Sequence, residues 1–242
     1  MKLISINIER DRHYARWMPW VKAEQPDVVC LQELYEEDAP RLAAELGYAY
    51  RAFAPLTVHG VSPEGRAQVV MGQGIWSKAP LEKVHVIPYA GEGTGRDVFD
   101  TTTPESKVAT SRYSLLSADV GGTRIVTTHF VWTPDGEVDD NQRSACTVML
   151  EKLQGLGNVV LCGDFNAPRG KETFARLAEV YKDNIPPHYM NSIDKTLHRA
   201  GATIKDYMVD GLFTTPAYKA TDVRLVGGVS DHMGVVGEIT RI

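Results

Sequence analysis

The fold of this chain is decided by the stretch Val159-Val160-Leu161-Cys162-Gly163-Asp164-Phe165-Asn166-Ala167-Pro168-Arg169-Gly170. Four apolar residues run directly into Gly-Asp-Phe-Asn and then into a turn that contains proline and glycine. A short continuous apolar run bounded by turn residues is typical of a strand that is covered on both faces. Ligands of layered α/β folds collect where such strands end. The stretch therefore predicts a buried strand that delivers Asp164 and Asn166 to a cleft.

Asp164 and Asn166 have both a functional and a structural interpretation. They are two residues apart, so they point to the same side if the strand continues through both. A carboxylate beside a carboxamide suits Mg²⁺, which takes oxygen ligands, and the amide can donate a hydrogen bond to a phosphate oxygen. Both residue types are also common at strand ends as local backbone caps. The stretch alone leaves the two interpretations open, and the rest of the chain must separate them.

Length and composition predict one α/β domain over residues 1–242. The chain is 43% hydrophobic and has a net charge of −5. This charge argues against global attraction to nucleic acid, although a metal ion and a few local cations can hold a phosphate on an acidic protein. Cys30, Cys146 and Cys162 lack the spacing of metal ligands and are expected to be reduced thiols of the core. Without a signal sequence or a long apolar span, a cytoplasmic protein with no membrane partner is expected.

Hydrophobic periodicity predicts many short strands and few helices. Besides the strand that begins at 159, strands are expected over 3–8, 27–34, 48–54, 68–77, 113–119, 123–130, 209–214, 220–226 and 235–239, and helices over 14–24, 36–46, 142–154 and 172–180. The long polar loops 55–66 and 91–107 are typical of segments that cover a site. Residues 181–204 show no clear pattern. Strands that are partly alternating and partly buried predict two packed sheets with helices outside.

Polar side chains stand at the ends of several expected strands. They are Asn7, Glu9, Glu33, His129, Asp164, Asn166, Asp210, Asp231 and His232. Several carboxylates without a basic partner imply a bound divalent cation, and an aspartate next to a histidine, with a further aspartate available, supplies an oriented imidazole. Asn7 and Glu9 are two apart and are expected on one side of their strand.

Single members of this set also have simpler interpretations. A carboxylate at the end of an apolar strand is costly unless it is paired or bound to a cation. Glu33 would be satisfied by a salt bridge as well as by a metal ion, and His129 would be satisfied as a surface imidazole. The functional interpretation depends on all of these residues meeting in one place.

In their order, these motifs resemble the endonuclease/exonuclease/phosphatase family, which has the DNase I-like fold. The matching segments are Ser5-Ile6-Asn7-Ile8, Leu31-Gln32-Glu33, Gly74 to Pro80, Thr128-His129, Gly163-Asp164-Phe165-Asn166, Val209-Asp210 to Phe213 and Ser230-Asp231-His232. Each motif is short, and their common order from residue 4 to residue 239 carries the resemblance. It implies a four-layer αββα sandwich with two mostly antiparallel sheets, and a phosphoesterase that depends on Mg²⁺ or Mn²⁺.

The resemblance also implies which residues hold the metal ion. Glu33 binds it, with Asn7 and Asp231 close by. Glu9 completes this set, although it stands where many members have Asp. The extra methylene is expected to shift the metal ion or to open room for a different group.

The implied catalytic set is His129, Asp164, Asn166, Asp210 and His232. Asp164 positions or deprotonates the attacking water, and Asn166 and His129 hold the phosphate. Asp210 orients His232, which contacts a phosphate oxygen and supports the transition state. Phosphoryl transfer concentrates negative charge on the nonbridging oxygens, which a cation and fixed donors stabilise without covalent help from the protein.

The second departure from the family pattern concerns substrate. His129 stands where abasic-site endonucleases have Tyr, so abasic-site repair is disfavoured, and the DNase, sphingomyelinase, tyrosyl-DNA phosphodiesterase and inositol phosphatase branches are closer. Arg143 also matches a family pattern, but a helix-surface arginine explains it equally well.

The leading prediction is a metal-dependent hydrolase of phosphodiesters, with nucleic acid or a nucleotide-like diester as the substrate. The alternative within enzymes is a phosphomonoesterase or a lipid or sugar phosphodiesterase, because a fold does not determine a substrate. A catalytically inactive binding protein is less favoured, since every expected polar position holds a competent residue. The sequence does not indicate an oligomeric state.

Overall fold

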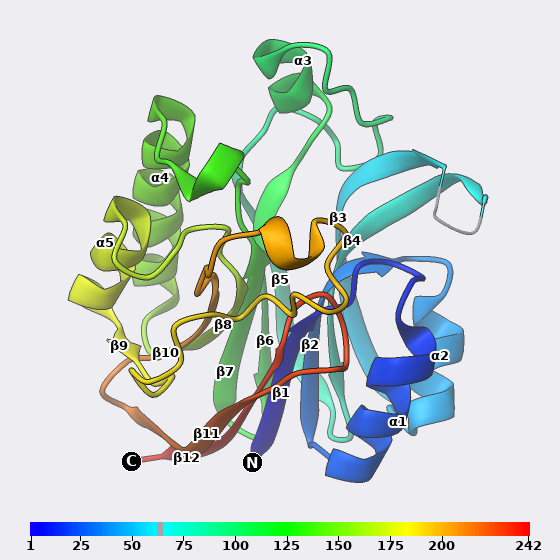
Figure 1. The fold of residues 1–242 in the computed structure, drawn as a ribbon. Coiled ribbons are helices and arrows are strands. Elements are labelled where there is room, and N and C mark those ends of the chain that lie inside the picture. The colour runs from blue at the N-terminus through cyan, green and yellow to red at the C-terminus, as the bar shows by residue number, and fades with distance from the viewer. Residues whose placement is uncertain (62–64) are drawn as a thin grey trace.

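The computed structural model describes residues 1–61 and 65–242. Its strands are β1 (Lys2–Asn7), β2 (Val28–Tyr35), β3 (Tyr50–Val61), β4 (Ala67–Ser77), β5 (Leu81–Ala90), β6 (Tyr113–Val120), β7 (Thr123–His129), β8 (Val160–Asp164), β9 (Lys182–Asp183), β10 (Asp210–Thr214), β11 (Tyr218–Val226) and β12 (Gly234–Arg241). Its helices are α1 (Tyr14–Glu24), α2 (Ala39–Leu46), α3 (Pro104–Ala109), α4 (Asp140–Leu156) and α5 (Glu172–Val180), with short 3-10 helices η1 (Pro134–Gly136) and η2 (Gly201–Thr203). Figure 1 shows their arrangement.

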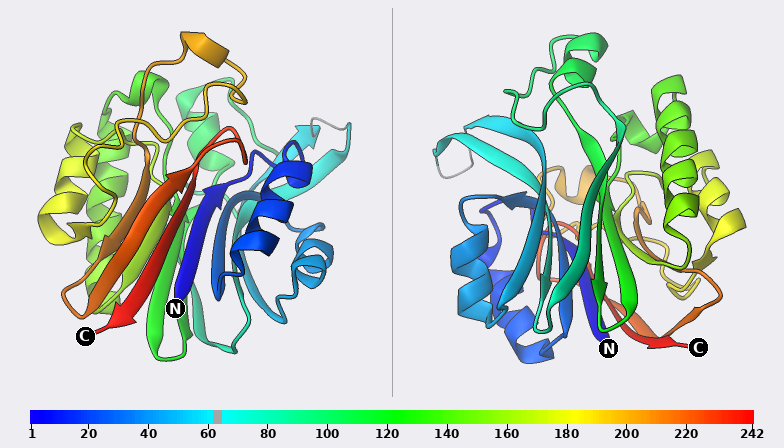
Figure 2. Two further views of the ribbon diagram at one scale, coloured as in Figure 1. Left: turned by 60° about the horizontal axis from the view of Figure 1, so that its bottom comes forward. Right: turned by 180° about the vertical axis from the view of Figure 1, so that it is seen from behind.

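The strands form two six-stranded sheets, in the orders β11-β12-β1-β2-β4-β3 and β5-β6-β7-β8-β10-β9. In each sheet one pair is parallel, β1 with β2 and β7 with β8, and the other pairs are antiparallel. Helices α1 and α2 cover the outer face of the first sheet, and α4 and α5 cover that of the second (Figure 2). The expected four-layer αββα sandwich with mostly antiparallel sheets is therefore confirmed.

One end of the sandwich collects strand ends from both sheets. Asn7 pairs with Gln32 where β1 and β2 finish, and His129 pairs with Asp164 where β7 and β8 finish. β10 runs antiparallel to β8 and starts at Asp210, opposite Asp164. Parallel neighbours finish at the same edge of a sheet and an antiparallel neighbour starts there. Polar residues from distant parts of the sequence, carried by both sheets, are thereby brought to the same end of the sandwich.

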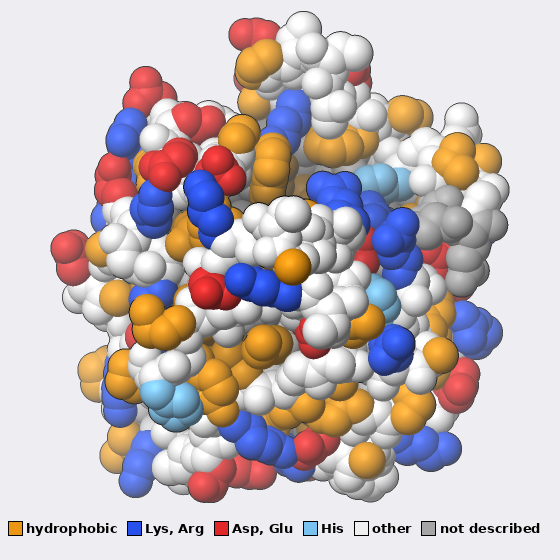
Figure 3. Space-filling model, viewed as in Figure 1, with side chains coloured by type: hydrophobic (Ala, Val, Ile, Leu, Met, Phe, Trp, Pro, Cys, Tyr) orange, Lys and Arg blue, Asp and Glu red, His pale blue; other side chains and the backbone are white. Residues whose placement is uncertain are grey.

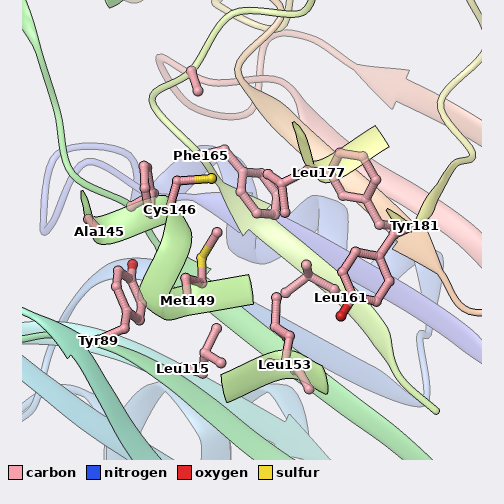
Figure 4. Close-up of a cluster of buried hydrophobic side chains, with 14 of the residues drawn as sticks. Tyr89, Leu115, Ala145, Cys146, Met149, Leu153, Leu161, Phe165, Leu177 and Tyr181 are labelled. Atoms are coloured by element: carbon pink, nitrogen blue, oxygen red, sulfur yellow. The ribbon is translucent and has the colours of Figure 1, made fainter. Parts of the chain in front are cut away.

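The sequence of β8 is continuously apolar because both faces of the strand are covered. Val160 and Cys162 pack into the core between the two sheets, whereas Leu161 packs under α4 beside Met149 and Leu153 (Figure 4). All residues of β8 are buried. A strand that is covered on both faces has no solvent side, so polar residues do not alternate with apolar ones.

The same strand contains a glycine that its position requires. Gly163 has φ of +142°, and a Cβ atom built on it would lie 2.0 Å from the carbonyl oxygen of Thr128 on the neighbouring β7. Such an approach is open only to glycine. The glycine of the Gly-Asp-Phe-Asn motif thus lets β7 and β8 pair closely up to His129 and Asp164.

The prediction of a loop over residues 55–66 is wrong for most of its length. β3 continues to Val61 and pairs with β4, which begins at Ala67. Residues 62–64 of the expected loop lie outside the described part of the chain. Pro55 is tolerated because the register of β3 against β4 shifts between Pro55 and Thr57, and a bulge accommodates a residue without an N–H group.

The loop expected over residues 91–107 is partly confirmed. It is irregular up to Thr103, whose side chain caps α3 by accepting a hydrogen bond from the N–H of Ser106. β5, by contrast, was not expected. Five of its residues in succession, Glu82 to Val86, are exposed, because β5 is an edge strand, and an edge strand with little buried surface shows no apolar alternation.

The remaining expectations on the core concern the cysteines and the helices. Cys30, Cys146 and Cys162 are buried and free. Among the described residues, no helix combines the length and the apolar character that crossing a membrane would need.

Candidate active site

Asp164 is the centre of the polar cluster at the end of the sandwich. Its Oδ1 accepts a hydrogen bond from the backbone N–H of Asn166 at 2.9 Å. Its Oδ2 accepts a hydrogen bond from Asn7 Nδ2 at 3.0 Å, and the Nε2 atoms of His129 and His232 lie 3.6 and 3.8 Å from it. The side chain is 1% exposed. One oxygen therefore serves as the local cap, and the other faces three potential donors.

The expectation that Asn7 and Glu9 share a strand face was wrong. Asp164 and Asn166 were expected to share one only if their strand continued through both, and this condition is not met. β1 ends at Asn7 and β8 at Asp164, and Glu9 and Asn166 have φ angles of 44° and 48°. The N–H of Glu9 donates to Asn7 Oδ1 at 3.1 Å, and Asn166 Nδ2 donates to the carbonyl of Phe130 at 2.9 Å. The alternation of side chains holds only while the strand continues, and both strands turn at once.

A backbone irregularity turns Glu33 toward the cluster. The register of β2 against β4 shifts between Gln32 and Leu34, and Glu33 between them has φ of 55°. A bulge of this kind redirects one side chain out of the regular alternation. Glu33 Oε1 lies 3.4 Å from Asn7 Nδ2, and its Oε2 lies 3.8 Å from Arg10 Nε.

The charges around Glu33 favour its ionised form. Burial alone would raise its pKa, but His129, Arg10 and the amide of Asn7 outweigh burial, so the pKa of Glu33 is lowered. The sequence left open whether Glu33 forms a salt bridge. Its contact with Arg10 is long, at 3.8 Å, so the carboxylate remains available to a cation.

Asp210 and His232 form a buried pair. His232 Nδ1 lies 2.9 Å from Asp210 Oδ2, and the backbone N–H of Asp210 donates to Ser192 Oγ at 3.1 Å. Burial disfavours a charged imidazole, but the carboxylates of Asp210 and Asp164 outweigh it and raise the pKa of His232 well above its ordinary value. With Nδ1 held by Asp210, Nε2 points to the side of Asp164.

The carboxylates at the end of β1 and before β12 have the character of a cation site. Asp231 is 7% exposed. Its burial raises its pKa to about 7, and the charges of Glu33 and Glu9 act in the same direction while His232 opposes them. Several buried carboxylates that repel one another are stabilised by a divalent cation with oxygen ligands, such as Mg²⁺ or Mn²⁺. The residues present thus fit the expected metal ion.

The structure adds a histidine that the sequence did not reveal. His13 Nε2 lies 2.9 Å from Glu9 Oε2. Glu9, His13 and Asp231 each offer a ligand atom within 4.8 Å of the others, and Asp164, Asp210 and His232 form a second such group. His13 stands just before α1 in a run of charged residues, where no periodic pattern distinguishes it.

The segment 184–207, which includes most of the residues 181–204 that the sequence left unassigned, crosses this end of the sandwich with η2 on it (Figures 1 and 2). It is anchored to the site by Ser192, which accepts hydrogen bonds from the N–H groups of Val209 and Asp210, and by Asp194, whose N–H donates to the carbonyl of Asp231 at 2.7 Å. Irregular segments of this kind are fixed by specific tertiary hydrogen bonds, which leave no periodic signal.

Two further histidines border the cluster. His59 of β3 and His198 of the segment 184–207 are partly buried, which lowers the pKa of both. Figure 3 shows histidine and basic side chains gathered right of the centre of this face.

Three basic side chains of the second half of the chain have acidic partners. Arg143 bridges Glu172 on α5, at 3.0 Å, and Asp140, at 2.9 Å, which supports its interpretation as a helix-surface residue. Arg169 Nη2 lies 2.7 Å from Asp183, and Lys171 pairs with Glu137.

These features define a class of protein: a two-sheet αββα sandwich that gathers carboxylates, carboxamides and imidazoles at one end. The chain belongs to the Endonuclease/Exonuclease/phosphatase family, whose sequence profile matches residues 4–232. No protein in the curated set matches the chain.

Solved structures agree with this fold. An endonuclease/exonuclease/phosphatase from Beutenbergia cavernae has a TM-score of 0.72 at 20% identity, over 100% of this chain and 71% of that one. An AP endonuclease from Archaeoglobus fulgidus has a TM-score of 0.67 at 18% identity, over 98% of both chains. A 3' phosphatase from Neisseria, bound to a product DNA hairpin, has a TM-score of 0.64 at 18% identity, over 99% of both chains. The two neighbours of named activity act on phosphoester bonds.

Proposed function

We propose that this protein is a divalent-metal-dependent phosphoesterase that hydrolyses phosphodiesters by in-line attack of water. The observation that carries the proposal is the surroundings of Asp164 Oδ2, with Asn7 Nδ2 at 3.0 Å and the Nε2 atoms of His129 and His232 at 3.6 and 3.8 Å. A carboxylate that faces several donors across short gaps, beside further buried carboxylates, can hold a water molecule and a phosphate group at the same time.

The metal ion would be held by Asn7, Glu9, Glu33 and Asp231, and when bound it supplies a Lewis acid for a nonbridging phosphate oxygen. The position of these residues around the same cluster supports the assignment. Arg10 lies 3.6 Å from Glu9 and 3.8 Å from Glu33, so its guanidinium is near enough to help neutralise a bound phosphate.

The other residues of the cluster orient the water and the phosphate. Asp164 accepts a proton from the attacking water, and Asn7 holds the carboxylate in place through its amide. His129 and His232 donate from Nε2 to nonbridging oxygens, and Asp210 keeps the ring of His232 oriented from the other nitrogen. The carboxylates of Asp210 and Asp164 raise the pKa of His232 and so favour the protonated imidazole that this role requires.

Asn166 has a positional role in this proposal. Its N–H donates to Asp164 Oδ1 and its Nδ2 to Phe130, so it holds the carboxylate and the end of β7. A direct contact between Asn166 and the phosphate, as the family resemblance implies, requires the amide to exchange Phe130 for the substrate.

The proposal predicts release of nitrophenol from bis(4-nitrophenyl) phosphate in the presence of Mg²⁺ or Mn²⁺, and no release after chelation by EDTA. Bis(4-nitrophenyl) phosphate presents a diester, and 4-nitrophenyl phosphate is the matched monoester. Turnover of the monoester with no cleavage of any diester would replace the proposal by the phosphatase alternative. Metal binding without turnover of diester, monoester, lipid or sugar phosphate substrates would support an inactive binding protein.

The proposal leaves nucleic acid among its candidate substrates, and a salt series tests this. Arg12 and Arg16 follow β1 and have exposed side chains, and Arg12 makes only a long contact with Glu9 at 3.6 Å. Arg169 and Lys171 have closer acidic partners. If an oligonucleotide is bound, the logarithm of affinity falls with the logarithm of salt by roughly 0.7 to 0.9 per phosphate contact.

Replacing Arg12 and Arg16 by Gln should make this slope shallower by the equivalent of about one to two phosphate contacts in total. Arg51→Gln is the control, because Arg51 lies near the start of β3 at the opposite end of the sandwich. A KM that is insensitive to salt for oligonucleotide and small ester alike would argue for a small substrate.

A further inference from the structure

The short connection between β1 and α1 brings His13 back to the carboxylates. Glu9 and Arg10 both adopt left-handed backbone conformations, with φ of 44° and 63°. For residues other than glycine this conformation is strained and is kept only where the surroundings demand it. The turn places the imidazole of His13 four residues later beside the side chain of Glu9, with Nε2 2.9 Å from Oε2.

The other oxygen of Glu9 has different neighbours. Arg10 and Arg12 approach Oε1 at 3.6 Å, which leaves Oε2 on the side of His13. The third member of the group, Asp231, receives a hydrogen bond from Ser230 on Oδ1 at 3.2 Å. One nitrogen and two carboxylates therefore converge, each with a ligand atom within 4.8 Å of the others.

The distance between His13 Nε2 and Glu9 Oε2 can be compared with the spacing of two ligand atoms on one ion. Two ligands at about 2.1 Å from an octahedral ion lie about 3 Å apart when adjacent and about 4.2 Å apart when opposite. The 2.9 Å between His13 Nε2 and Glu9 Oε2 corresponds to the adjacent case. A longer side chain at position 9 than the usual aspartate suits an ion displaced toward His13.

We propose that His13 supplies an imidazole nitrogen to the metal ion held by Glu9 and Asp231, so that the site selects Mn²⁺, Co²⁺ or Zn²⁺ over Mg²⁺. Imidazole suits these transition metals, whereas Mg²⁺ is bound by oxygen ligands. The inference rests on the proposed function, because it concerns the same metal ion, and it adds a ligand and a preference that the other residues do not provide.

The competing explanation is that His13 only donates a hydrogen bond to Glu9 and orients it. The variant His13→Gln separates the two, because its amide can still donate to Glu9 but offers no imidazole. His85→Gln is the matched control, since His85 lies exposed on β5, away from the cluster.

The test measures metal binding by the protein without substrate. Electron spin echo envelope modulation of bound Mn²⁺ should show a directly coordinated nitrogen in the wild type and in His85→Gln, and should lose it in His13→Gln. Calorimetry should show Mn²⁺ affinity in His13→Gln reduced beyond the roughly tenfold loss that removal of an orienting partner causes, with Mg²⁺ affinity reduced much less.

Absence of nitrogen coupling in the wild type, or its persistence in His13→Gln, would overturn the assignment. Equal losses of Mn²⁺ and Mg²⁺ affinity would do the same and leave His13 as an orienting group. If the ion binds through oxygen alone and diesters are still hydrolysed, the proposed function stands without His13. If no divalent ion binds or supports hydrolysis, the proposed function itself fails.

Discussion

Asp210→Asn and His232→Ala are each expected to lower the rate of diester hydrolysis on the order of 10²- to 10⁴-fold, the range for a positioned acid-base group. His232 Nδ1 lies 2.9 Å from Asp210 Oδ2, and the negative charge of Asp210 helps to keep the imidazole protonated. Without that charge, the ring loses both its orientation and part of its cationic character. Most of the loss should appear in kcat, because the imidazole acts on charge that develops in the transition state.

The double variant of Asp210 and His232 shows whether the two residues act together or separately. If Asp210 acts only through His232, the double variant loses little more than the worse single variant, because residues that act as a unit are not additive. Asp119→Asn is a suitable control, since Asp119 also holds a basic partner, Arg124, at 2.8 Å, but lies beside the hairpin at the other end of β6. Losses that multiply in full would show that the two residues act independently, and thermal unfolding of each variant separates loss of activity from loss of fold.

Glu33→Gln is the second change with a large expected effect. The substitution keeps the size of the side chain and removes a partly buried charge that faces Asn7 and Arg10. Metal affinity should fall by at least about 10- to 100-fold, the range for groups that support a metal ion. At limiting Mg²⁺ or Mn²⁺ the rate should fall in proportion, and excess metal ion should restore part of it, because the other ligands remain.

The control for this experiment is Glu36→Gln. Glu36 lies three residues further along the chain and pairs with Arg96 on the surface at 2.7 Å, so it shares the region without facing the cluster. Rates for both variants are measured across a metal titration on the chromogenic diester. Activity near that of the wild type for Glu33→Gln at limiting metal ion would remove Glu33 from the metal site.

Much of the candidate site was accessible from the sequence because its residues stand where strands end. An apolar run ends where the chain leaves the core, and that point is visible without knowledge of the partner strand. Asn7, His129, Asp164 and Asp210 were all found in this way, and the structure brings them together because β1, β2, β7 and β8 finish at one edge and β10 begins there.

The predictions from the sequence were wrong for two strands whose structure depends on pairing with a neighbouring strand and not on a hydrophobic pattern. The segment 55–61 contains a proline and polar residues, yet it pairs along β4. β5 exposes five consecutive residues and is held by hydrogen bonds to β6, which supply stability without an apolar pattern.

The sequence by itself determined the sandwich, several of its buried strands and the identity of most polar residues at their ends, because apolar runs and turn residues are local properties of the chain. Only the tertiary structure decided where these side chains point. Glu9, Glu33 and Asn166 lie in left-handed conformations, and no local pattern reports that a strand turns or bulges at one residue. The meeting of His13 with Glu9 and Asp231 follows from those backbone angles and from the pairing of β12 with β1, which bring together residues more than 200 positions apart.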